Sequence, residues 1–167
     1  MPKKTYSKFK IIRDSREKKG CGWRFRASSN CSGMLTRKLE TGDYSIDGYE
    51  DLIMIERKTI GDLWGTLTFG RDRFIKELER AKEIPARFII IEATLKDINA
   101  GIRYSKVQPD FIIASLISFQ IKYGVQVVFT DKRVDVAQAY ARKLITKLFQ
   151  YCEDGVISKD GKPNYST

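Results

Sequence analysis

The sequence contains no histidine, and this absence removes several kinds of catalytic site. Serine–histidine and cysteine–histidine pairs, histidine-ligated zinc and the histidine-metal nucleases all depend on an imidazole. Any hydrolytic chemistry in this chain must therefore use carboxylates, lysine and a metal ion bound through oxygen atoms.

Cysteine and long apolar runs are also scarce. The three cysteines, Cys21, Cys31 and Cys152, form neither a disulfide framework nor a C-x-x-C pair, so we expect an intracellular, reducing location. The longest apolar stretch, residues 111–119, is interrupted by serines and is far shorter than the roughly 20 residues that a membrane span needs. The Lys-rich N-terminus lacks the apolar segment of a signal peptide, and we expect no membrane association.

Positive charge, in contrast, is abundant. Basic residues outnumber acidic ones by 31 to 21, which gives a formal net charge of +10. A surplus of this size fits a polyanionic partner such as DNA. Charge alone leaves a second interpretation open, that of a soluble basic protein without such a partner.

Residues 53–62 form the stretch around which the chain is organised. An apolar run, Ile-Met-Ile, is typical of a buried strand and ends directly in Glu56, Arg57 and Lys58. Because residues two apart on a strand share a face, Glu56 and Lys58 lie together and Arg57 points the other way. A carboxylate beside an ammonium group suits the binding of a divalent metal and a phosphate. The alternative is an ordinary strand end that reaches solvent.

Two further charged motifs precede this stretch. Residues 14–17 read D-x-R-E, residues 42–44 read G-D-Y, and residues 56–63 read E-R-K-x-x-x-D-L. In this order and approximate spacing the motifs resemble the nuclease domain of the XPF family of structure-specific DNA endonucleases. The likeness covers roughly residues 8–130. It implies a restriction-nuclease-like fold, a metal-dependent nuclease and a domain that dimerises.

Alternating strands and helices also favour an α/β fold, with a mixed sheet of about six strands flanked by helices. The length fits a single XPF-like nuclease domain over residues 1–154, followed by a flexible C-terminal tail over residues 155–167. The expected strands span residues 9–13, 34–40, 43–46, 53–58, 87–92 and 125–129. The expected helices span residues 60–83 with an interruption near Gly70, 95–100, 109–123 and 131–152.

The connection between the third and fourth strands can be drawn in two ways. A tight hairpin turn at Asp47-Gly48 would leave Asp43 roughly 13 Å along the strand from Glu56, too far for a shared metal ion. A longer loop over about residues 47–52 would place Asp43 opposite Glu56. We predict the longer loop, because a shared metal site requires it.

The motifs define a candidate catalytic set. Asp43 and Glu56 are the expected ligands of Mg²⁺ or Mn²⁺, with Asp14 as a further metal ligand and Glu17 beside it, because these ions prefer oxygen. Lys58 would orient a water molecule or neutralise developing charge. Arg16 and Arg57 have two open roles, phosphate contact or ion pairs that hold the carboxylates.

Asp62 also has two open roles. Thr59 and Asp62 have the form of a helix capping box, which gives the aspartate a structural purpose. The family resemblance counts it with the active-site residues.

A polar segment over residues 15–33 carries basic residues around two aromatic rings and is typical of a loop that contacts a phosphate backbone. Trp23 either stacks on a base or packs into the core. The expected DNA-binding residues are Arg16, Lys18, Lys19, Trp23, Arg24, Arg26, Arg71 and Arg73.

The function expected from these features is a Mg²⁺- or Mn²⁺-dependent DNA endonuclease that acts on branched, flap or fork DNA in repair or recombination. Two alternatives are a catalytically silent DNA-binding and dimerisation partner and a sequence-specific nuclease of the restriction type. The helix over residues 131–152 has more apolar positions than one buried face uses, so we expect a homodimer through this helix and residues 109–123. A separate targeting protein is a further possible partner.

Overall fold

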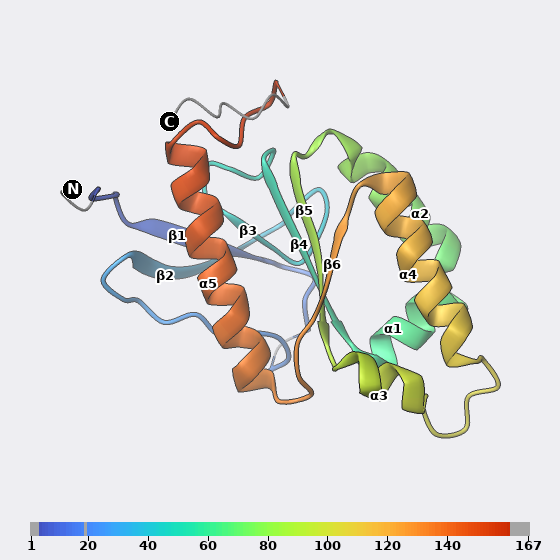
Figure 1. Cartoon of the computed structure of the whole chain (residues 1–167). Coiled ribbons are helices and arrows are strands. Elements are labelled where there is room, and N and C mark those ends of the chain that lie inside the picture. The colour runs from blue at the N-terminus through green and yellow to red at the C-terminus, as the bar shows by residue number, and fades with distance from the viewer. Residues whose placement is uncertain (1–3, 19, 161–167) are drawn as a thin grey trace.

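In the computed structural model, the chain folds into a six-stranded sheet with helices on both faces (Figure 1). The structure describes residues 4–18 and 20–160. The strands are β1 (Phe9–Asp14), β2 (Cys31–Arg37), β3 (Tyr44–Ile46), β4 (Ile53–Thr59), β5 (Ala86–Glu92) and β6 (Gln126–Phe129). The helices are α1 (Ile60–Leu67), α2 (Arg71–Arg80), the short 3-10 helix η1 (Ala81–Glu83), α3 (Leu95–Ala100), α4 (Pro109–Tyr123) and α5 (Val134–Glu153). The predicted α/β class and mixed sheet are confirmed.

The strand order is β2-β1-β3-β4-β5-β6. Strand β3 runs antiparallel to β1 and β4, whereas the pairs β1–β2, β4–β5 and β5–β6 are parallel. The carboxyl ends of β4 and β5 therefore lie at the same edge of the sheet, which faces downward in Figure 1. Each of these two strands carries charged residues to that edge.

The pairing of β3 with β4 confirms the longer of the two predicted loops. Tyr44 pairs with Ile55, so Asp43 and Glu56, the adjacent residues outward, face each other across the two strands. The connection is closed by main-chain hydrogen bonds from Tyr49 to Ile46 and from Leu52 to Tyr49. Asp47-Gly48 does not form a two-residue hairpin turn.

Each face of the sheet has its own apolar core. Helix α5 covers one face, where Ile55 of β4 and Ile90 of β5 are fully buried. Helices α1 to α4 cover the other, against Ile89 and Ile91 of β5 (Figure 1). Residues on β4 thus alternate between the α5 side and the α1–α4 side, which fixes the direction of every side chain at its charged end.

The apolar surplus on α5 is smaller than predicted. We expected Tyr140, Ile145 and Phe149 to form it, but Ile145 and Phe149 are buried against the sheet with Ala137 and Ala141. Tyr140 is exposed, as expected. The reason is helical spacing, because the buried residues of α5 recur three or four positions apart and so lie on one face.

Several predicted boundaries moved by a few residues. Strand β2 begins at Cys31, three residues before the expected start, because its Cys-Ser-Gly segment pairs with β1. Helix α5 begins at Val134, not at Asp131. Residues 155–160 of the expected flexible tail pack on the domain, with Ile157 against the α5 core, while residues 161–167 lie outside the described residues. Among the described residues, no helix has the length and apolarity needed to cross a membrane.

Candidate active site

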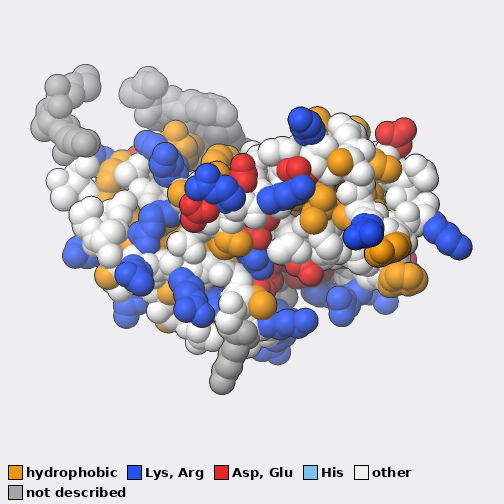
Figure 2. Space-filling view, turned by 90° about the horizontal axis from the view of Figure 1, so that it is seen from below, with side chains coloured by type: hydrophobic (Ala, Val, Ile, Leu, Met, Phe, Trp, Pro, Cys, Tyr) orange, Lys and Arg blue, Asp and Glu red, His pale blue; other side chains and the backbone are white. Residues whose placement is uncertain are grey.

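A pocket of about 820 Å³ opens at the lower edge of the sheet, where β4 ends. Five of the predicted catalytic residues lie on its wall, together with Arg73: Glu17, Asp43, Arg57, Lys58 and Asp62. Figure 2 views this side of the molecule: Lys and Arg side chains spread over the surface, and acidic side chains lie recessed near its middle. The motifs that were far apart in the sequence therefore meet at one site.

A glycine positions Asp43. Gly42 has a φ of +75°, and a Cβ there would lie 2.9 Å from Met54 Cγ and 3.1 Å from the Ile55 carbonyl oxygen. This close approach lets the Asp43 N–H donate to the Ile55 carbonyl (2.9 Å). The Asp43 carboxylate in turn accepts a hydrogen bond from the Arg57 N–H (2.8 Å). Both the main chain and the side chain of Asp43 are thus hydrogen-bonded to β4.

Glu56 and Lys58 lie together on the α1–α4 side of β4, as predicted. The Glu56 side chain is buried beneath the pocket, and its carboxylate forms an ion pair with the Lys58 ammonium group. The Lys58 Nζ also lies 5.0 Å from the centre of the Phe74 ring of α2. Lys58 is therefore held by a carboxylate on one side and an aromatic face on the other.

The carboxylates carry more negative charge than their surroundings compensate. Burial, opposed by the Arg57 N–H and Lys58, raises the pKa of Asp43 to about 7. Burial and the charge of Asp43 raise the pKa of Glu56 to about 8, although Lys58 works against this. Burial also acts to lower the pKa of Lys58, but Glu56 and Asp43 outweigh it and hold that pKa above its ordinary value. Lys58 stays protonated and acts as a cation.

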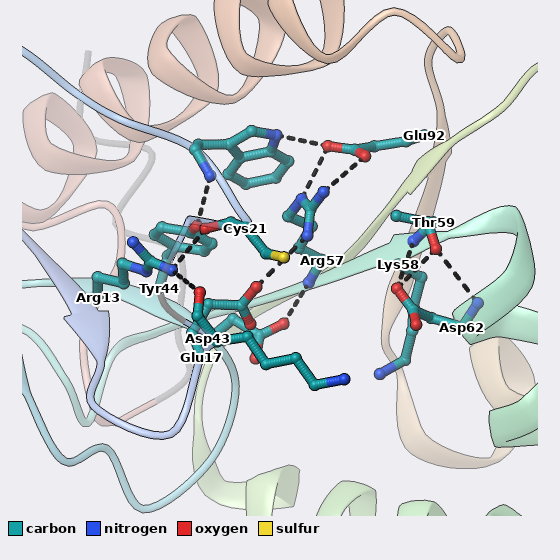
Figure 3. Close-up of polar contacts among 12 residues, drawn as sticks. Arg13, Glu17, Cys21, Asp43, Tyr44, Arg57, Lys58, Thr59, Asp62 and Glu92 are labelled. Carbon is teal, nitrogen blue, oxygen red and sulfur yellow. Dashed lines mark hydrogen bonds and ion pairs between the residues drawn. The ribbon is translucent and has the colours of Figure 1, made fainter.

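Arg57 points to the opposite side of β4, where it forms an ion pair, one of its two predicted roles. Its guanidinium group donates two hydrogen bonds of 2.8 Å to Glu92 at the end of β5, and it also approaches Glu17 (3.4 Å) (Figure 3). The Glu92 carboxylate accepts a further bond from the indole N–H of Trp23 (2.8 Å). Arg57 therefore connects two strands and the loop after β1.

The expectation that Trp23 stacks on a DNA base is wrong. Trp23 is 0% exposed and stacks on Tyr44, with ring centres 4.9 Å apart. Its main-chain N–H donates to the Tyr44 hydroxyl (2.7 Å), and Phe25 packs against both rings. The packing of Trp23 and Phe25 on Tyr44 holds the loop after β1 against the core. This loop also carries Glu17, which lies on the pocket wall.

Asp14 and Arg16 form a closed pair beside the pocket. The Asp14 carboxylate accepts hydrogen bonds from the Arg16 guanidinium, the Arg16 N–H and the Leu39 N–H, at 2.7 to 2.9 Å. Burial alone would raise the pKa of Asp14, but these donors outweigh it and hold the pKa below its ordinary value. Both oxygens of Asp14 are engaged by the protein itself, and Arg16 serves as its ion-pair partner.

Asp62 forms the predicted capping box at the start of α1. Its N–H donates to the Thr59 hydroxyl (3.2 Å), and its carboxylate accepts from the Thr59 N–H (3.4 Å). Thr94 and Asp97 repeat the same box where β5 passes into α3. Asp62 has a structural role in addition to its place on the pocket wall.

The other expected DNA-binding residues are divided among three places. Lys18 and Arg73 line the pocket together with Arg16. Arg24 and Arg26 are exposed on the loop that packs on α5. Arg71 donates to Ser115 and lies between two aromatic rings of α4, and Lys19 lies outside the described residues.

Two functional residues were missed in the sequence. Glu77 of α2 accepts the Gly42 N–H (3.1 Å), and its charge adds to the rise in the pKa of Asp43 and Glu56. Glu92 holds Arg57. Glu92 could have been found, because it ends a buried strand as Glu56 does, whereas Glu77 lies among alternating charges of a surface helix and carries no such signal.

The residues fit a divalent cation bound through oxygen. Within residues 4–18 and 20–160, no group of three or more His, Cys, Asp or Glu side chains is arranged to hold a metal ion. Mg²⁺, however, takes only one or two protein carboxylates and completes its shell with water. Asp43 and Glu56 supply two such groups, and both carboxyl groups have a raised pKa, chiefly because they are buried.

Comparison with known proteins gives the following matches. A family model described as the ERCC4 domain matches residues 13–142. No curated protein matches the chain. Among solved structures, XPF from Aeropyrum pernix is similar with a TM-score of 0.59 and 20% identity, over 88% of this chain and 66% of that chain. The same protein in complex with DNA is similar with a TM-score of 0.61 and 22% identity, over 90% of this chain and 68% of that chain.

At these identities the solved structures establish a shared fold. The chain spans about two thirds of the length of the solved chains. The family match extends from the last residues of β1 into α5 and so includes the whole candidate site.

The raised pKa values predict that the metal-free protein loses stability as pH rises. A group whose pKa is higher in the folded state stabilises the fold below its unfolded value, here about 4, and loses that contribution as pH passes through the folded value, about 7 for Asp43 and 8 for Glu56. In EDTA, the melting temperature should therefore fall between about pH 5 and pH 8.5. Asp43→Asn should flatten this slope, whereas Asp72→Asn on the surface should not. Equal slopes in the three proteins would contradict the assignment.

The two capping boxes provide a matched test of Asp62. Asp62→Ala and Asp97→Ala should each lower the free energy of unfolding by about 1 kcal/mol or more, because each removes a cap. Only Asp62→Ala should also slow phosphodiester cleavage, measured in single turnovers on fully folded protein. Equal rates in the two variants would restrict Asp62 to its capping role.

Proposed function

Since the chain belongs to the ERCC4 domain family, we propose that it is a DNA endonuclease of the XPF type that uses Mg²⁺ or Mn²⁺. The observation that carries the proposal is the facing pair Asp43 and Glu56 with Lys58 beside it. Asp43 and Lys58 lie on the wall of a pocket bordered by basic residues, and Glu56 is buried next to Lys58. Branched, flap or fork DNA in repair or recombination is the proposed substrate class. The solved structure of XPF from Aeropyrum pernix in complex with DNA, which has a similar fold, supports DNA as the partner.

Asp43 and Glu56 would hold the metal ion. The bound ion supplies a positive charge that polarises the scissile phosphate and lowers the pKa of a water molecule. In the reaction, the water oxygen attacks phosphorus and the bond to the leaving oxygen breaks, which leaves one phosphate end and one hydroxyl end.

The remaining residues of the site are proposed to neutralise charge on the phosphate and to position the reacting groups. Lys58, kept protonated by its carboxylate neighbours, stabilises negative charge on the phosphate oxygens. Glu17 lies on the pocket wall and is proposed to orient a water molecule there. Asp14, whose oxygens are engaged by Arg16 and Leu39, is proposed to act as a positioning residue that shapes the loop carrying Glu17.

Basic residues around the pocket would bind the DNA backbone. Lys18 and Arg73 are assigned to the phosphates next to the scissile bond, because both line the pocket. Arg24 and Arg26 are assigned to more distant phosphates, because they are exposed on the loop after β1. These contacts supply most of the affinity and make it dependent on salt.

A homodimer through α4 and α5 is retained as a proposal, with different residues at its centre. Strand β6 forms an edge of the sheet and is only partly covered. Ile121 of α4, 79% exposed, and Tyr140 of α5, 41% exposed, leave apolar surface on the two helices that flank it. An apolar area of this kind on a monomer favours an interface.

Three substitutions test the chemistry. Asp43→Asn, Glu56→Gln and Lys58→Ala should each lower the single-turnover cleavage rate of a flap or fork substrate by about 100-fold or more, because each removes a ligand or a charge from the site. DNA affinity in EDTA should change little, since the phosphate contacts remain. Glu79→Gln and Lys10→Ala, on exposed surfaces, should cut at the unmodified rate. A catalytic variant that cuts as fast as these controls would refute the proposal.

The dimer can be tested without destroying the core. Ile121→Glu combined with Tyr140→Glu should give a folded monomer by light scattering at tens of micromolar. Ile145→Glu should unfold the chain instead, because it places a charge in the core of the α5 face. An unmodified protein that is already monomeric at this concentration excludes the interface.

A further inference from the structure

Helix α1 contains two glycines that nothing within the chain explains. A Cβ built at Gly61 or Gly65 would meet no atom within 4 Å, and neither residue has a positive φ. Glycine inside a helix costs up to about 1 kcal/mol relative to alanine, so the helix loses stability at both positions without a packing benefit. Because the two residues are four apart, they form one strip of bare main chain on a single face.

The glycine strip, Gly61 and Gly65, lies between the candidate active-site pocket and a second groove. A groove of about 560 Å³ lies between α1 and the segment over residues 101–107, which connects α3 to α4. Gly61, Gly65 and Phe69 line both the pocket and the groove. The groove is therefore a continuation of the candidate active site.

Two aromatic rings stand exposed along this groove. Phe69 is 101% exposed and Tyr104 is 89% exposed. Tyr104 has a φ of +66°, the one positive value among the described residues that are not glycine. This conformation costs about 1–2 kcal/mol in an L-residue. The fold thus presents two large apolar faces to solvent and strains the backbone at one of them.

The polar groups of the groove suit a phosphate backbone. Arg103 and Lys106 line it, and the Arg103 guanidinium lies 5.0 Å from the centre of the Tyr104 ring. Trp64, also on the groove wall and 3% exposed, has an indole N–H without a hydrogen-bond partner in the described part of the chain. This donor has almost no accessible surface, so the phosphate contacts of the groove are assigned to Arg103 and Lys106 alone.

We propose that this groove binds an unpaired stretch of the DNA strand as it leaves the catalytic pocket, an inference that rests on the proposed nuclease function. Unpaired bases stack on Phe69 and Tyr104, and the sugar-phosphate chain passes over the glycine strip. Exposed aromatic rings can stack only on bases whose faces are free, which paired bases inside a duplex do not offer. The proposal assigns to this groove the recognition of the single-stranded arm of a branched substrate.

The test compares two DNA probes in EDTA, a duplex with a single-stranded tail and the same duplex with blunt ends. Phe69→Ala and Tyr104→Ala should each weaken binding to the tailed probe by about tenfold, because each removes one stacking partner. Binding to the blunt probe should stay within about twofold. Tyr104→Phe, which keeps the ring, and Tyr151→Ala, an exposed aromatic on α5, should behave like the unmodified protein. Equal losses on both probes, or no loss, would overturn the proposal.

The glycine strip is tested by a second set of variants. Gly65→Ala should raise the melting temperature, because alanine favours the helix, and Gly65→Leu should remain folded, because the space around it is open. Both should weaken binding to the tailed probe, leucine more than alanine. Unchanged affinity in Gly65→Leu would contradict the close approach of a strand.

A cleavage assay of the unmodified protein with Mg²⁺ separates this inference from the proposed function. A protein that binds as predicted but cuts no substrate would refute the nuclease and leave the groove assignment standing. A protein that cuts tailed DNA while the aromatic and glycine variants bind it normally would refute the groove alone.

Discussion

Two carboxylates that face each other beneath one pocket are the constraint on which this structure depends. Asp43 and Glu56 belong to neighbouring antiparallel strands, and their charges repel within a poorly hydrated space. The two carboxylates remain close together despite this repulsion, because other residues of the site hold them in place. The hydrogen bond from the Arg57 N–H to Asp43 and the ion pair of Lys58 with Glu56 compensate the charge only in part. The divalent cation proposed for this site would neutralise both carboxylates when bound.

The other face of β4 holds the site rigid. Alternation along one strand sends Lys58 into the pocket and Arg57 toward the α5 core. There, Glu92 binds both Arg57 and Trp23, which ties the loop after β1 to the carboxyl end of β5. Two of the proposed catalytic groups, Glu56 and Lys58, therefore share β4 with Arg57, which supports the site from the other face. Loss of the contact between Glu92 and Arg57 would change the position of Arg57. The change would reach the pocket, because the Arg57 N–H binds Asp43.

Local sequence rules were sufficient for much of the fold. The capping boxes, the proline at the start of α4 and the glycine at its end act within a few residues, and each marked a boundary closely. The register of β3 against β4 followed from chemistry, since a shared site required Asp43 opposite Glu56. Long-range packing was not accessible in the same way. The partners of Trp23 lie 21 and 69 residues away, and no local pattern distinguishes a buried indole from one that stacks on a base.

Helix α1 begins at the residue that follows β4, and α3 begins three residues after the end of β5; each start is stabilised by its own threonine-aspartate box. Because no residue separates β4 from α1, an insertion or deletion at this junction would directly shift the proposed reacting groups. Length variation can be accommodated only in the connections that surround the site, such as residues 15–30 and 101–107. A change of length in these connections would alter the border of the pocket or of the groove beside it and leave the spacing of Asp43, Glu56 and Lys58 in place.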